Sequence, residues 1–335
     1  MNIFPWQDQL WTQLTAEPEK LPHALLLTGD AGLGKLAFAK ALAARLLCET
    51  PDRRGEQSFA CGRCNACKWF AAESHPDFRL VQPEEDEEEG GSTETEKAEN
   101  AGSSENAGNT PAQSNGKKPG RAATVSKSKS GQTKKRTLIR IHQIRDLFDF
   151  VFLGSHQQGR RIVVLHPAEA MNAEAANSLL KILEEPPSSI CFILVSSAWR
   201  KLLPTIRSRC RLVTMTCPDK DTALAWLKQE GVKDAAELLS LTGGAPLLAQ
   251  EWARQERLGV YKKAIDIMAT QTDDPVAMAA QWQTLLKGEQ AFDLPQLVGI
   301  VQKWTADLLQ MKLANTSRYH GHRDADLRRL SAPAG

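Results

Sequence analysis

The chain has 335 residues, of which 41% are hydrophobic and 24% are charged. This length predicts two or three domains rather than one, and the composition excludes a globally disordered protein. With 42 Lys and Arg residues against 40 Asp and Glu, the formal net charge is only +2, so no general attraction to nucleic acid or membrane is predicted.

Other features of the whole chain bear on its location. No apolar run reaches the roughly 18 residues that cross a bilayer, and the first residues lack a signal-peptide pattern. Seven cysteines, four of them close together in the sequence, favour a reducing compartment and a metal site over a secreted disulfide framework. We therefore expect a soluble, cytoplasmic protein.

A phosphate-binding motif lies in the first strand–helix pattern. Residues 24–28 predict a strand, and an Ala- and Leu-rich pattern over about 35–47 predicts a helix. Between them, three glycines and a lysine match the pattern G-x-x-x-x-G-K-[ST]: Gly29, Gly32, Gly34 and Lys35. The last position is Leu36, which offers no oxygen to magnesium. We expect a degenerate P-loop with weak or vestigial nucleotide binding and no magnesium-dependent hydrolysis; a turn that only packs helix on strand is the alternative.

Four cysteines follow this helix: Cys48, Cys61, Cys64 and Cys67. Four thiolates converging from a helix end and a tight C-x-x-C-x-x-C turn are typical of a closed, tetrahedral structural zinc site. We predict one zinc ion per chain in a module at about residues 48–67. Buried or redox-active thiols and an iron–sulfur cluster are the alternatives.

The composition changes abruptly between about residues 83 and 136. An acidic run is followed by Gly, Ser, Thr and Asn and then by scattered Lys and Arg, with almost no aliphatic or aromatic residue. Such a segment cannot bury enough apolar area to offset its chain entropy, so we predict a disordered insertion that acts as a solvated linker. DNA binding by its basic end is the alternative.

Helices and strands alternate again after this insertion. The pattern predicts a helix at about 143–152, a strand at 161–165, a helix at about 173–183 and a strand at 190–195. Such alternation indicates an α/β fold with a parallel sheet covered by helices.

The strand at 161–165 should end in an acid that binds magnesium. His166 and Pro167 stand there instead, and the nearest acid, Glu169, is predicted to lie in a turn. This second departure also predicts a P-loop fold that does not hydrolyse ATP.

Three arginines stand at alternate positions after the last of these strands: Arg207, Arg209 and Arg211. They could form a solvated edge. An arginine placed here could also project from the domain and neutralise charge on a phosphate bound by a neighbouring subunit, which is the role of an arginine finger.

Beyond Cys217 the strand signal disappears. Helices are predicted at 221–230, 234–241, 246–254, 275–287 and 295–313. The C-terminal third is therefore expected to be all-helical.

Taken together, these residues resemble the delta-prime family of the bacterial DNA polymerase III clamp loader, which belongs to the AAA+ group. Besides the P-loop and the four cysteines, the resemblance rests on five segments: Pro5-Trp6-Gln7, Leu21-Pro22-His23-Ala24-Leu25-Leu26, His75-Pro76-Asp77, Asn177-Ser178-Leu179-Leu180-Lys181-Ile182-Leu183-Glu184-Glu185-Pro186-Pro187 and Ser208-Arg209-Cys210. It covers most of residues 1–217.

The resemblance implies a domain organisation. A RecA-like AAA+ P-loop domain would span residues 1–217, a helical lid 218–257, and a helical collar that holds a five-subunit ring together 258–335. A long insertion departs from the family pattern, and the collar looks short, so whether it is complete stays open.

The resemblance also implies roles. Arg209 would act in trans on the ATP site of an adjacent motor subunit, and Pro246 replaces the lid arginine of active relatives. The implied function is a non-hydrolysing subunit of the polymerase holoenzyme, a nucleotidyltransferase, that supports loading of the sliding clamp onto primed DNA. Its partners would be the clamp-loader ATPase subunits, the delta subunit, the clamp and, through the complex, DNA, with no membrane. An active motor subunit and a zinc-dependent DNA-binding regulator are the alternatives.

Overall fold

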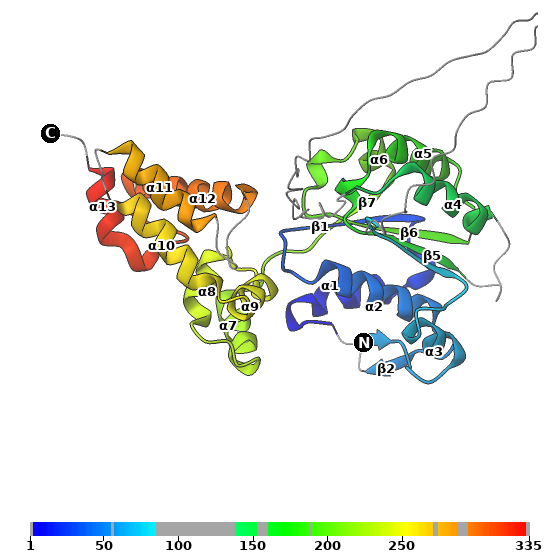
Figure 1. The fold of residues 1–335 in the computed structure, drawn as a ribbon. Coiled ribbons are helices and arrows are strands. Elements are labelled where there is room, and N and C mark those ends of the chain that lie inside the picture. The colour runs from blue at the N-terminus through cyan, green and yellow to red at the C-terminus, as the bar shows by residue number, and fades with distance from the viewer. Residues whose placement is uncertain are drawn as a thin grey trace, which may run out of the picture. The chain divides into compact units, whose positions relative to one another are not determined.

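The computed structural model describes residues 3–54, 57–84, 138–152, 160–187, 189–270, 274–286 and 294–332. The insertion predicted at about 83–136 falls almost entirely outside the described residues. The described chain has an α/β part followed by a helical part (Figure 1). None of its helices combines the length and the hydropathy of a membrane span within these ranges.

A five-stranded parallel sheet forms the centre of the α/β part. Its strands, in spatial order, are β4 (Phe78–Val81), β5 (Arg161–Leu165), β6 (Ile190–Val195), β1 (Ala24–Thr28) and β7 (Arg211–Thr214). Every residue of β1, β5 and β6 is buried. Apart from Arg161 and Thr28 at strand ends, these three strands are continuous apolar runs because both faces of the sheet are covered.

Each face of the sheet has its own helices and its own core (Figure 1). One face carries α1 (Asp8–Thr15), α2 (Lys35–Leu47) and α3 (Asn65–Ala71), and the other carries α4 (Ile141–Phe152), α5 (Ala173–Glu184) and α6 (Pro204–Arg209). Side chains of β1 alternate between the cores: Leu25 and Leu27 pack with the first set, Ala24 and Leu26 with the second. This alternation follows from the two-residue period of a strand.

A small antiparallel hairpin lies between α2 and α3 in the chain. It consists of β2 (Asp52–Arg54) and β3 (Gln57–Phe59). Phe59 anchors the hairpin to the domain because its ring stacks on the buried ring of Trp11, with centroids 5.2 Å apart.

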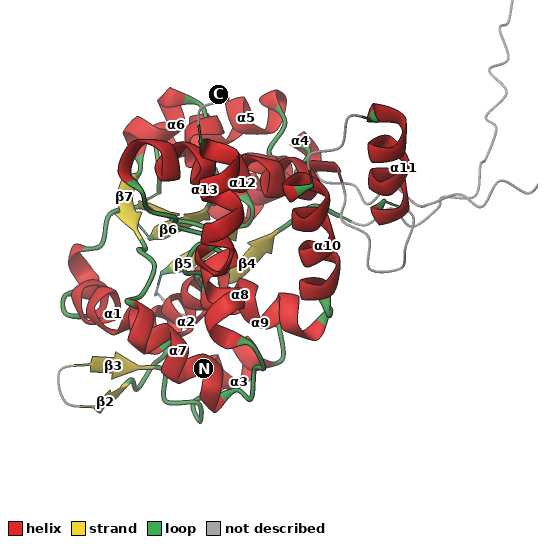
Figure 2. Cartoon of the chain, turned by 90° about the vertical axis from the view of Figure 1, so that its left-hand side faces the viewer, coloured by secondary structure: helices red, strands yellow, loops and turns green. Residues whose placement is uncertain are grey.

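After β7, Figure 2 shows only helices in the part of the chain that the structure describes. They are α7 (Lys220–Gln229), α8 (Ala235–Leu241), α9 (Pro246–Arg254), α10 (Arg257–Ala269), α11 (Pro275–Leu285), α12 (Leu294–Ala314) and α13 (Asp324–Ser331). Their buried side chains form one cluster from Ala223 to Leu327. The predicted lid and collar thus share a core, and their boundary stays a prediction.

The predicted α/β class and the all-helical third are confirmed, and the strands at 24–28, 161–165 and 190–195 have the predicted bounds. Two strands of the central sheet, β4 and β7, were not predicted, and neither was the hairpin β2–β3. The placement of the three arginines after the last strand was therefore wrong: Arg207 and Arg209 lie in α6, and Arg211 begins β7.

Candidate functional sites

The P-loop joins β1 to α2 and is closely surrounded by other parts of the chain. Gly29, Gly32 and Gly34 have φ angles of 134°, 79° and 81°, which L side chains rarely adopt. A Cβ atom on Gly32 would lie 2.5 Å from the Cβ of Leu248, and one on Gly34 would lie 2.6 Å from the Cε2 of Phe4. The glycines are therefore required by the packing of the N-terminal segment and α9 against the loop.

The carbonyl groups of this loop accept hydrogen bonds from the protein itself. The indole Nε1 of Trp6 and the amide Nε2 of Gln7 both donate to the carbonyl of Leu33, at 3.1 and 2.9 Å. The backbone N–H of Leu247 donates to the carbonyl of Gly32 at 3.1 Å. The N-terminal segment and the start of α9 thus hold the loop in place.

Aromatic contacts fix the N-terminal segment in turn. The rings of Phe4 and Trp6 stack with centroids 4.9 Å apart, and Trp226 of α7 meets both rings edge-on, at 5.7 and 5.4 Å. Such contacts add to the apolar area that each ring buries. Pro5-Trp6-Gln7 was identified only as a family signature, and its contact with the P-loop was not predicted.

Lys35 lies at the start of α2, as predicted, but its ammonium group already makes hydrogen bonds within the loop. Its Nζ donates to the carbonyls of Gly29 and Asp30 at 2.9 and 2.6 Å. The side chain is only 5% exposed, and burial lowers its pKa, which nearby Glu169 and Asp30 partly oppose. Leu36 packs on the core of this face, so an apolar contact replaces the hydroxyl of the motif.

The carboxyl end of β5 lies next to the P-loop, since His166 and Glu169 both interact electrostatically with Lys35. Burial lowers the pKa of His166, which favours its neutral form. Glu169 lies in a short turn, as predicted, and its Oε1 accepts hydrogen bonds from the backbone N–H groups of Ser197 and Ala198 at 3.0 and 3.1 Å. The Glu169 carboxylate therefore holds the segment after β6 in place.

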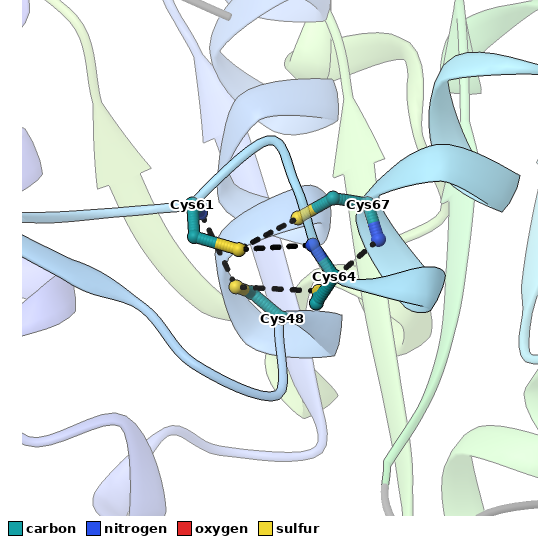
Figure 3. Close-up of side chains that lie close together, drawn as sticks. All are labelled: Cys48, Cys61, Cys64 and Cys67. Carbon is teal, nitrogen blue, oxygen red and sulfur yellow. Dashed lines mark hydrogen bonds between the residues drawn. The ribbon is translucent and has the colours of Figure 1, made fainter.

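The four predicted metal ligands converge (Figure 3). Cys48 follows α2, Cys61 follows β3, and Cys64 and Cys67 lie at the start of α3. Their sulfur atoms all lie within 4.8 Å of one another, and the Cys48–Cys64 and Cys61–Cys67 pairs are 3.9 Å apart. Tetrahedral zinc with bonds of about 2.3 Å places its sulfur ligands about 3.8 Å apart. The cluster could thus hold a metal ion such as zinc.

Local donors favour the thiolate of Cys61, whereas burial raises the pKa of Cys48 and Cys67. The backbone N–H groups of Cys64 and Cys67 donate to the sulfurs of Cys61 and Cys64 at 3.3 and 3.4 Å, and the hydroxyl of Thr50 donates to Cys61 at 3.4 Å. The Thr50 hydroxyl, with the backbone N–H groups of Arg63 and Cys64, lowers the pKa of Cys61 to about 6. Thiolates are the form that binds metal.

The three remaining cysteines lie outside the cluster. Cys191 and Cys210 are buried. Cys217 is only partly buried, and its sulfur lies 3.8 Å from a carboxylate oxygen of Asp30 in the P-loop.

The three arginines of the predicted finger segment have different surroundings. Arg209 ends α6, is 34% exposed, and pairs with Glu184 of α5 at 2.7 Å. The guanidinium of Arg207 lies 5.3 Å from the ring centre of Trp199, and Arg211 is exposed at the start of β7. The solvated edge and the arginine finger both stay predictions.

Comparison with known proteins gives consistent matches. The family model described as "DNA polymerase III, delta subunit" matches residues 6–219. A Pseudomonas aeruginosa protein named DNA polymerase III subunit delta' is 34% identical over 98% of this chain and 83% of its own length. Proteins of the same name from Yersinia pestis and Escherichia coli are 30% and 27% identical, over 78% and 73% of this chain.

The chain spans 64% and 59% of the lengths of the Yersinia and Escherichia relatives. Among solved structures, a DNA polymerase III gamma subunit-related protein from Thermotoga maritima is 16% identical, with a TM-score of 0.40. That alignment covers 96% of this chain and 77% of the other.

Proposed function

This chain belongs to the DNA polymerase III delta-subunit family, and we propose that it is a delta-prime-type subunit of the clamp loader that does not hydrolyse ATP. It would join ATPase subunits and a delta subunit in a hetero-oligomeric ring that loads the sliding clamp onto primed DNA. The observation that carries the non-hydrolysing part is the engagement of Lys35 by the carbonyls of its own loop.

ATP hydrolysis needs a free P-loop lysine, which this chain binds within its own loop, and two magnesium ligands, which the motif positions of this chain lack. A P-loop lysine must reach the terminal phosphates, and magnesium needs a hydroxyl and a carboxylate. Here Leu36 and His166 stand at the two ligand positions. A phosphate binds such a loop through backbone N–H groups and the lysine, so it would have to draw Nζ of Lys35 away from the carbonyls of Gly29 and Asp30.

We propose structural zinc as the metal of the four-cysteine cluster. The 3.9 Å sulfur separations match a tetrahedral site, and four thiolates leave no position open for a substrate or water. The ion would fix the hairpin β2–β3 and the start of α3 on the end of α2.

The exposed apolar side chains of the helical part support assembly with partners. Seven large ones are exposed on or beside α11 and α12: Val276, Leu286, Leu294, Val298, Val301, Leu309 and Leu313. Only four others are this exposed among the described residues. Concentrated exposed apolar surface marks protein contacts, so we assign ring assembly to this part of the chain.

Co-expression with the clamp-loader ATPase subunits tests the proposed role. We expect the full chain to co-purify in a stoichiometric complex, and omission of the chain to abolish clamp loading onto primed DNA. A complex that assembles and loads clamps equally well without the chain would contradict the proposal.

A further inference from the structure

The motif that ends α5 is not explained by the site described so far. Glu184 is the last residue of α5, and Glu185, Pro186 and Pro187 follow it. The carboxyl end of a helix carries partial negative charge, so carboxylates are unfavourable there. Helix stability therefore gives no reason for an acid at position 184.

The contact that Glu184 makes does give a reason. Its Oε1 lies 2.7 Å from Nη2 of Arg209, and Nη1 of Arg209 donates to the carbonyl of Thr205 at 3.0 Å. One contact comes from α5 and the other from α6, so the guanidinium is held from two sides by its own domain. A guanidinium has five N–H donors in one rigid plane, so three remain for another partner.

We propose that Glu184 is a positioning residue for Arg209. This inference rests on the proposed role of Arg209 as an arginine finger acting on a neighbouring subunit. With both terminal nitrogens held, the flexible side chain keeps one orientation, and its remaining donors face the partner without reorganising during the reaction. Donors fixed in advance stabilise developing phosphate charge better than mobile ones.

The test is ATP hydrolysis by the reconstituted complex. Glu184→Ala should lower turnover at the one neighbouring ATP site by about 5-fold, which corresponds to the upper range for an exposed ion pair, so the whole complex should lose a smaller fraction of its rate. The KM for ATP should not change because another subunit binds the nucleotide. Glu184→Gln should recover much of the rate because its amide oxygen still accepts from Arg209, and the matched control Glu185→Ala should leave the rate unchanged.

A double-mutant cycle separates positioning from a structural role. In an Arg209→Ala background, Glu184→Ala should cause no further loss, and size-exclusion chromatography should show an intact complex throughout. A further loss in that background, a faster kcat, or an equal loss from Glu185→Ala would overturn the inference. If Arg209→Ala slows hydrolysis and Glu184→Ala does not, only the positioning role fails. If Arg209→Ala itself has no effect, the proposed finger fails and this inference fails with it.

Discussion

The P-loop and the four-cysteine cluster are both ligand motifs in the sequence, but the protein uses their polar groups differently. In the P-loop, Lys35 and the carbonyls of Gly32 and Leu33 already have partners within the chain. In the cluster, the four sulfurs face one another within 4.8 Å, and those of Cys61 and Cys64 accept hydrogen bonds from backbone N–H groups of the same turn. The four-cysteine motif thus presents its ligand atoms to one another, whereas the P-loop lysine has partners within its own loop.

Loss of one cysteine of the cluster should have the largest effect. Structural zinc sites bind with apparent free energies of about 10–16 kcal/mol at neutral pH, and a closed site needs all its ligands. Cys64→Ser should reduce zinc from one ion per chain to nearly none, as measured by elemental analysis. Cys217→Ser is the control and should retain the ion. A folded wild-type chain with four titratable thiols and no metal would remove the zinc assignment.

Substitution of Arg209 tests whether this chain contributes to ATP hydrolysis by a neighbouring subunit although its own P-loop lysine is bound within the loop. Arg209→Ala should slow hydrolysis at one neighbouring ATP site by about 10³- to 10⁵-fold, because arginine fingers stabilise transition-state charge by that amount. The whole complex should lose only part of its ATPase rate because its other sites remain.

Arg211→Ala is the control for Arg209→Ala, since Arg211 is exposed at the start of the next strand. Arg207 is less suitable because its guanidinium lies over Trp199. Equal rates for Arg209→Ala and Arg211→Ala in an intact complex would refute the finger.

Lys35 should matter for stability even without nucleotide. Lys35→Ala leaves the carbonyls of Gly29 and Asp30 without their buried donor, which should lower the free energy of unfolding by about 1–3 kcal/mol. Urea denaturation measures this difference. The control is Lys40→Ala in the same helix, where Lys40 is 31% exposed and lies 3.7 Å from Glu73. Equal stability of both variants would show that Lys35 is not tied to its loop.

Restoring the missing magnesium ligands should have the smallest effect. Leu36→Thr combined with His166→Asp supplies a hydroxyl and a carboxylate at the two empty positions of the pattern. We expect no gain in ATP hydrolysis by the isolated chain, because Lys35 keeps its hydrogen bonds to the carbonyls of Gly29 and Asp30. Restored ATP hydrolysis would show that the missing magnesium ligands alone prevent hydrolysis, and that the hydrogen bonds of Lys35 within the loop do not.

The sequence predicted the central strands because both faces of β1, β5 and β6 are buried, which leaves continuous apolar runs. It did not predict β4 and β7, which form the two edges of the sheet. β7 has only four residues, of which three are exposed, so it lacks the continuous apolar run of the central strands.

The two candidate sites also differ in how far the sequence predicts them. The metal ligands could be predicted because three of them lie within one short turn and share one residue type. The hydrogen bonds that other segments donate to the P-loop could not be predicted, because Gln7 and Leu247 contact the loop from distant parts of the chain. The pairing of Glu184 with Arg209 also depends on how α5 and α6 pack, which no local pattern encodes.

Single-turnover hydrolysis of ATP by the purified full-length chain, with and without magnesium, tests the central claim most directly. The account predicts no phosphate release above the uncatalysed rate, whether or not nucleotide binds weakly. Magnesium-dependent release of phosphate that is abolished by Lys35→Ala would contradict it, because Lys35 would then have left the carbonyls of Gly29 and Asp30 to reach a nucleotide.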